Sequence, residues 1–211
     1  MTNSTSGRTR RRQEERREQA ERSLLMAAAE LIGEVGPTKM RLSDIGARAG
    51  YSRGLTTHYF GTKGELIRKI MDTVTDDFHT ELASHDLDQG ALASINDIVS
   101  TYFTRLRGDD PMVRARIALW ADAAAGGTEE ERKHAIEADE RFRVEIITRL
   151  TKGMEAGEVP ADLDLDAFTT VLIGMLRGTA VRYLLHGKVD LAPCEAEALA
   201  FVKGRLGPHG H

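Results

Sequence analysis

The chain has 211 residues, enough for one or two domains with an apolar core, and a net charge of −4 at pH 7. Aromatic residues make up 5% of it. With few strand-like runs, this composition predicts an all-α fold, and the helix signals along the chain indicate about nine helices. The single cysteine, Cys194, excludes an intrachain disulfide and favours a reducing, cytoplasmic location. The arginine-rich N-terminus lacks the apolar run of a secretory signal, and Arg177 and Arg182 interrupt the most apolar stretch, so no membrane span is expected.

Basic residues are concentrated at the N-terminal end. Residues 1–70 contain fourteen Lys and Arg against eight Asp and Glu, whereas residues 71–211 contain fifteen against twenty-five. A basic segment in an acidic chain is typical of a module that binds DNA phosphates. Residues 8–22 hold seven arginines and four glutamates. They are interpreted as an arm that reaches the DNA, as a charged extension of the first helix, or as a solvated tail.

Residues 42–60 predict a helix-turn-helix after a first helix near Arg22–Val35. Apolar residues recur at spacings of three and four from Leu42 to Ala49, and Gly50 suits the left-handed residue that ends a helix. Ser52 is expected to cap the second helix through its hydroxyl group. Gly46 is small, as required where the second helix crosses the first.

The second helix of this motif separates its residues by angle. At about 100° per residue, Thr56 and Tyr59 fall on one side. The other side carries three polar residues and a glycine, which has no side chain: Arg53, Gly54, Thr57 and His58. Arginine can bind guanine bidentately, threonine can contact a base or a phosphate, and glycine allows the backbone to approach DNA closely. The alternative interpretation is an ordinary helical corner inside a core.

The residues that follow strengthen the DNA-binding interpretation. Thr62 and Glu65 have the spacing of a capping box, and Lys63 lies in the first turn of the third helix, where free N–H groups favour a phosphate. Over about residues 20–80 the chain resembles the TetR family of bacterial transcriptional regulators. The resemblance is carried by Ile45, Ala49-Gly50, Ser52-Arg53-Gly54, Tyr59-Phe60, Lys63 and Leu66. The expected DNA contacts are Arg41, Ser43, Ser52, Arg53, Gly54, Thr57, His58, Tyr59 and Lys63.

Helix signals recur along the rest of the chain. Asp110-Pro111 is a cap followed by proline at the first helical position, and Thr128 with Glu131 forms a second capping box. Asp164 or Asp166 is expected to start the penultimate helix, and Pro193 the last one. The predicted helices are about 65–84, 91–107, 111–125, 129–156, 166–186 and 193–206.

The helix at 166–186 is apolar nearly all round, so it must be covered nearly all round. A second copy of the chain is expected to cover one side, and Gly174 and Gly178 would permit close approach. The alternative is a central helix of a monomeric bundle. The family resemblance favours dimerisation through the last two helices. The expected interface residues are Phe168, Val171, Leu172, Met175, Thr179, Leu199 and Val202.

The resemblance also implies an effector pocket among the middle helices, residues 91–156. Its candidate residues are Tyr102, Phe103, Met112, Arg116, Trp120, His134 and Phe142, although each also suits a plain core. The implied organisation is a basic arm over 1–19, a helix-turn-helix domain over 20–80 and an effector-binding and dimerisation domain over 81–211.

Enzyme interpretations lack the necessary residues. No glycine-rich phosphate loop or nucleophile elbow is present, and a helical di-iron site needs two Glu-x-x-His pairs where Glu131 and His134 form the only one. We therefore expect no catalytic residue, metal or cofactor. The predicted function is a homodimeric repressor that binds a palindromic operator in double-stranded DNA and is released by a small-molecule effector. The alternatives are an effector-independent DNA-binding regulator, and a helical binding protein or enzyme that does not bind DNA.

Overall fold

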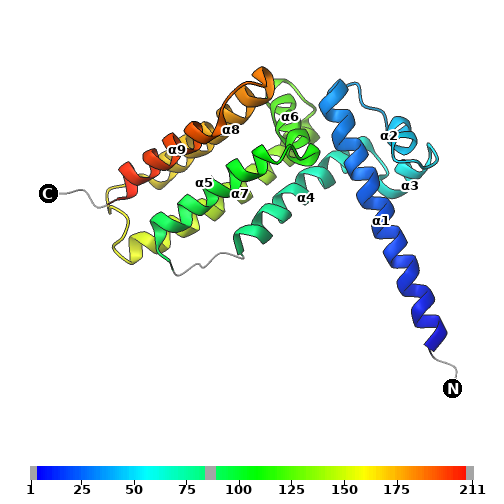
Figure 1. The fold of residues 1–211 in the computed structure, drawn as a ribbon, viewed down its shortest axis with the longest axis horizontal. Coiled ribbons are helices and arrows are strands. Elements are labelled where there is room, and N and C mark those ends of the chain that lie inside the picture. Colours follow the sequence, from blue (N-terminus) through cyan, green and yellow to red (C-terminus); the bar gives the residue numbers. More distant parts are fainter. Residues whose placement is uncertain (1–3, 84–88, 208–211) are drawn as a thin grey trace.

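The computed structural model describes residues 4–83 and 89–207, and this part of the chain contains nine helices and no strand (Figure 1). The predicted all-α class is confirmed. The helices are α1 (Ser4–Val35), α2 (Leu42–Arg48), α3 (Leu55–Phe60), α4 (Lys63–Ala83), α5 (Ala91–Arg107), α6 (Pro111–Ala125), α7 (Glu129–Glu155), α8 (Leu165–His186) and α9 (Leu191–Leu206). None of these described helices is both long and apolar enough to cross a membrane.

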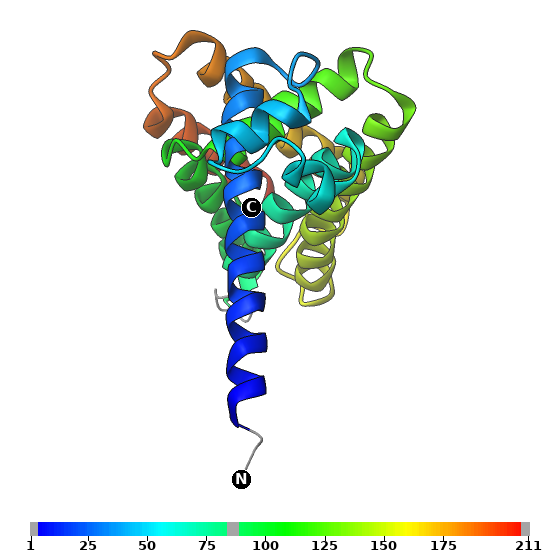
Figure 2. The same ribbon diagram turned by 90° about the vertical axis from the view of Figure 1, so that its right-hand side faces the viewer.

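Helix α1 is longer than the predicted Arg22–Val35, because the charged segment before it is helical too. Residues 10–19 are exposed, and ion pairs four residues apart join Arg10 to Glu14 at 3.3 Å and Arg11 to Glu15 at 3.1 Å. Such pairs support an isolated helix by a few tenths of a kcal/mol, about 0.2–0.5 each. The N-terminal half of α1 projects away from the other helices (Figures 1 and 2). Its contact with DNA stays a prediction.

Most predicted helix starts are confirmed by their capping bonds. The Asp110 carboxylate accepts from the Met112 amide at 2.8 Å, and the Thr128 hydroxyl accepts from the Glu131 amide at 3.2 Å. Asp164 caps α8 by accepting from the Ala167 amide at 3.0 Å. The last helix begins at Leu191 rather than Pro193, because the Asp190 side chain caps it two residues earlier.

The buried side chains form two clusters. One, the C-terminal core, joins α5, α7, α8 and α9 with the end of α4. The other, the N-terminal core, joins α1–α4 with α6 and the start of α7. Ala115 and Leu119 of α6 are buried in the N-terminal core, whereas Ile117 of the same helix packs against the C-terminal core. Helix α6 therefore connects the two halves of the molecule.

An ionic cluster joins α4 to α7. Glu145 lies 3.5 Å from His79 Nδ1 and 2.6 Å from Arg149 Nη2. The hydrogen bond from His79, with further help from Arg149, lowers the pKa of Glu145 to about 2 from 4.5, against the opposing effect of burial. A carboxylate with a depressed pKa stabilises the fold above its unfolded pKa and loses this effect as it becomes protonated.

We expect the free energy of unfolding to fall between about pH 4.5 and pH 2 by an amount that depends on Glu145. Because this carboxylate is partly exposed, solvent screening reduces its share to on the order of 1 kcal/mol. Urea unfolding of the wild type and of Glu145→Gln across this pH range measures the difference. Equal pH dependence in the two proteins would contradict the prediction.

Candidate nucleic-acid interface and effector cavity

The helix-turn-helix consists of α2, α3 and the turn at 49–54. Gly50 has a φ of +77°, as predicted for the residue that ends the first helix, and the Tyr51 amide donates to the Gly46 carbonyl at 2.8 Å. A Cβ atom at Gly46 would lie 2.5 Å from the Ser52 carbonyl oxygen and 3.2 Å from Thr56 Oγ1. The absence of a side chain at Gly46 therefore lets the turn close and sets the angle between the helices.

Gly46→Ala is expected to lower the free energy of unfolding by about 1–3 kcal/mol, because its methyl group would push against backbone rather than a flexible side chain. The urea midpoint measures this loss. Gly33→Ala is the matched control, since Gly33 is helical, exposed and has no atom within 4 Å of an added Cβ. The control is expected to gain up to about 1 kcal/mol through helix propensity. Equal behaviour of the two variants would refute this view of the turn.

The predicted cap at Ser52 is wrong. Helix α3 starts three residues later at Leu55, whose amide donates to the Ser52 carbonyl at 3.0 Å. Gly54 occupies the capping position and offers no side chain. The exposed Ser52 hydroxyl is therefore not used within the turn, because a tight backbone turn already fills residues 52–54.

The two sides of α3 differ as the angular pattern indicates. Thr56 is fully buried, and Tyr59 is half-buried. On the other side, exposed residues form a continuous polar flank: Arg53, Gly54, Thr57 and His58. Within the described residues Arg53 has no ion pair or hydrogen-bond partner. Its guanidinium is thus accessible, and contact between this flank and DNA stays a prediction.

The flanking candidates have different environments. Lys63, at the start of α4, is half-buried and donates from Nζ to the Thr38 carbonyl at 3.2 Å. This bond holds the ammonium near the helix N-terminus and leaves further N–H groups for a phosphate. Arg41 is exposed just before α2, and the Ser43 hydroxyl donates to Asp44 at 3.2 Å.

The helix-turn-helix is also fixed to α1 by an ion pair that the sequence analysis did not identify. Arg48, at the end of α2, makes two hydrogen bonds of 2.6 Å to Glu34 and lies 3.7 Å from Glu30. The guanidinium lowers the pKa of Glu34 through hydrogen bonding. A bidentate pair restricts orientation more than a single contact does, so it fixes α2 against α1.

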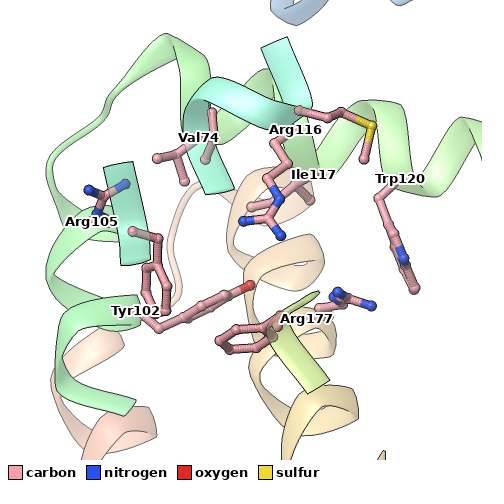
Figure 3. A pocket seen from close by; sticks show the side chains of 11 residues that line it. Val74, Tyr102, Arg105, Arg116, Ile117, Trp120 and Arg177 are labelled. Carbon is pink, nitrogen blue, oxygen red and sulfur yellow. The ribbon is translucent and has the colours of Figure 1, made fainter. Parts of the chain in front are cut away.

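A cavity of about 50 Å³ lies among α4, α5, α6, α7 and α8 (Figure 3). Four of the candidate effector residues line it, namely Tyr102, Arg116, Trp120 and Phe142. Three do not. Phe103 is buried in the C-terminal core and Met112 in the N-terminal core, while His134 lies outside the lining on α7.

The sequence analysis missed lining residues on α4 and α8. Met71, Val74 and Phe78 come from α4, which was assigned to the DNA-binding region alone. Arg177 comes from α8, and its charge in the middle of a mostly apolar helix was the available signal for a functional position. Arg105, from α5, completes a set of three arginines around the cavity.

Two of these three arginines are neutralised. Arg105 Nε lies 2.6 Å from Glu81, and Arg177 pairs with Asp139 while its guanidinium stacks 4.7 Å from the centroid of the Trp120 ring. Arg116 makes no ion pair or hydrogen bond with the part of the chain that the structure describes. Burial lowers its pKa to about 10, so it is still charged at neutral pH.

The candidate dimer residues lie partly inside the protomer. Phe168, Leu172 and Val202 are buried in its own C-terminal core, because this face of α8 and α9 packs against α5 and α7. These three residues therefore have no surface with which to contact a second copy. Met175, Thr179 and Leu199 are half-buried, and Val171 is 49% exposed. The exposed stripe of α8 consists instead of small or apolar residues with one arginine, namely Ala167, Thr170, Val171, Gly174, Gly178, Arg182 and Leu185.

Two family models match the chain. One, described as bacterial regulatory proteins of the tetR family, matches residues 24–70. The other, described as the C-terminal domain of BetI-type transcriptional repressors, matches residues 91–207, more than half of the chain. The chain belongs to the TetR family. The resemblance identified in its helix-turn-helix is confirmed, and the chain is a TetR-family transcriptional regulator.

Individual relatives agree with this assignment. The regulator BetI of Escherichia coli is 30% identical over 105 residues, which are 48% of this chain and 54% of that protein, so the chain spans about half the length of this relative. A TetR-family regulator from Rhodococcus sp. superposes with a TM-score of 0.76 at 18% identity, over 90% of this chain and 100% of that one. FadR from Bacillus subtilis, solved in complex with stearoyl-CoA, superposes with a TM-score of 0.72 at 21% identity, over 89% of this chain and 98% of that one. These structures share the fold.

Proposed function

We propose that this TetR-family regulator is a homodimeric repressor that binds a palindromic operator and is released by a small-molecule effector. The observation that carries the proposal is the polar flank of α3, which is exposed while Thr56 and Phe60 on its other side are buried. The proposed DNA contacts are the candidate residues at 41, 43, 52–54, 57–59 and 63. An arginine, hydroxyl groups and an imidazole on a short exposed helix provide donors for major-groove base edges.

The exposed stripe of α8 supports dimerisation. Small residues leave the backbone of α8 uncovered at Gly174 and Gly178, and an added Cβ at either meets no atom within 4 Å. On α9, Ala196, Ala200 and Gly204 are exposed at the same spacing of four. Two copies that pack these faces together would form a two-fold symmetric four-helix interface. Such symmetry presents two recognition helices to half-sites about 34 Å apart.

Helix α6 supports the coupling between effector and DNA. Ala115 and Leu119 pack in the N-terminal core, while Arg116 and Trp120 on the same helix line the cavity. A ligand that displaces α6 would therefore also displace α1, and with it the helix-turn-helix. To move the DNA-competent population from 99% to 1%, an effector needs a differential affinity of about 5.5 kcal/mol between the two states.

The test begins with selection of genomic DNA fragments bound by the purified protein. We expect a palindrome whose half-sites are one helical turn apart, and the affinity for a duplex that carries it should fall steeply with salt. Binding that is independent of sequence, or absent, would contradict the DNA-binding proposal. The proposed arrangement of a basic arm (1–19), a DNA-binding domain (20–80) and an effector and dimerisation domain (81–211) predicts that removing residues 1–19 weakens but does not abolish this binding.

A further inference from the structure

The cavity among α4–α8 combines an apolar wall with one unneutralised charge. Val74, Ile117 and Phe142 contribute to the wall, and burial there is what lowers the pKa of Arg116 and raises that of Tyr102 to about 12. Both side chains keep some accessible surface because they border the cavity. A charged group in such a place is costly unless an opposite charge accompanies it.

The two polar groups face the same space. In Figure 3 the guanidinium of Arg116 and the hydroxyl group of Tyr102 point toward one another, and Arg177 lies beyond them beside Trp120. Neither Arg116 nor Tyr102 has a hydrogen-bond partner among the described residues. A guanidinium supplies two parallel N–H donors, and a phenol supplies one O–H donor. Together they match the two oxygens of a carboxylate.

The charges around the cavity disfavour a cationic ligand. Arg105 and Arg177 are each paired with a carboxylate, Glu81 and Asp139, so among the described residues that line the cavity Arg116 is the arginine without an opposite charge. A cation placed here would add a second unpaired charge in a region of low dielectric. A monoanion would neutralise the charge of Arg116.

We propose that the effector site binds a small organic anion, in which a carboxylate contacts Arg116 and Tyr102 and an apolar body lies against Phe142 and Ile117. This inference rests on the effector role under Proposed function and specifies its chemistry. The volume of about 50 Å³ limits the size of the ligand. Because a single water needs about 10–15 Å³, the space suits a compact molecule rather than a long chain.

Calorimetric titration of the full-length protein with matched ligands tests the proposal. The carboxylates are butanoate, hexanoate and benzoate, and each is compared with its primary amide, with the amine of equal length, and with inorganic phosphate. We expect at least one carboxylate to bind at least about tenfold more tightly than its amide, and its amine not to bind, since a charge-assisted bond is lost or reversed. No preference for any carboxylate over its amide, or tighter binding of phosphate, would overturn the proposal.

Variants separate a ligand-binding arginine from a structural one. Arg116→Met should abolish the carboxylate preference while raising the melting temperature of the ligand-free protein, because an unpaired buried charge is removed. Tyr102→Phe should weaken carboxylate binding and keep the preference. Arg114→Met is the matched control on α6, since Arg114 is exposed and pairs with Asp109. A lower melting temperature in Arg116→Met together with an unchanged preference would refute the assignment.

The same samples distinguish this inference from the function on which it rests. If a carboxylate binds with the expected preferences but leaves operator affinity unchanged, the chemistry of the site stands and the regulatory coupling fails. If operator binding is intact and no carboxylate is preferred, the chemistry of the site is refuted and DNA binding stands.

Discussion

Arg53→Ala is expected to weaken operator binding by about 1–3 kcal/mol, which is roughly 5–150-fold in dissociation constant, if the guanidinium binds a guanine. The side chain is exposed on the polar flank of α3 and has no partner within the described residues, so its loss leaves the fold intact. Fluorescence anisotropy with the selected operator and with a duplex altered at one base pair measures both affinity and specificity. The variant should no longer discriminate between the two duplexes at the base pair that Arg53 contacts, while its preference at the other base pairs is unchanged.

Two further variants make this experiment decisive. Lys63→Ala should weaken binding to every sequence alike, since a phosphate contact carries no sequence information. Arg205→Ala removes the same charge from the C-terminal turn of α9, at the opposite end of the molecule from α2 and α3 (Figure 1), and should leave binding unchanged. A loss in Arg53→Ala no larger than in Arg205→Ala would show that Arg53 does not contact a base.

Gly178→Glu is expected to convert a dimer to a monomer. Nothing lies within 4 Å of a Cβ at this position, so the protomer accommodates the side chain and gains up to about 1 kcal/mol of helix propensity. In the proposed interface a glutamate at this position would hold the two helices apart and would lose hydration on association, and both effects oppose dimerisation. We expect at least about a 100-fold weaker dimer, roughly 2.7 kcal/mol.

Sedimentation velocity over a range of concentrations measures this change, and operator affinity should fall with it because a monomer reads one half-site. Gly33→Glu is the matched control, since Gly33 is also helical and exposed, and no atom lies within 4 Å of a Cβ added there. A Gly178→Glu protein that sediments as the control does would exclude this stripe from the interface.

The helix-turn-helix could be predicted because its signals are local. Gly50 ends α2 with a positive φ, and Gly46 has no side chain where the Ser52 carbonyl approaches it. At the start of α4 the Thr62 amide donates to the Glu65 carboxylate at 2.8 Å, and the Glu65 amide donates to the Thr62 hydroxyl at 3.1 Å. Each signal acts over a few residues. The cap at Ser52 failed for the same reason, since one residue type fits both a helix cap and the tight turn that the backbone adopts.

The faces of the C-terminal helices could not be predicted in this way. Helix α8 is apolar on several sides, so periodicity does not tell which residues meet the protomer's own core. The structure places Phe168 and Leu172 inside and Val171 outside. Likewise, Phe103 and Tyr102 are adjacent in sequence, yet only Tyr102 borders the cavity.

Helix boundaries and the polar flank of α3 thus follow from capping, turn chemistry and helical period, which depend on neighbours within about one or two turns. The cavity arises where five helices meet, and its unpaired Arg116 is recognisable only because Glu81 and Asp139 neutralise the other two arginines. Tertiary packing decides these features, because burial and ion pairing depend on residues that are distant along the chain and adjacent only in space.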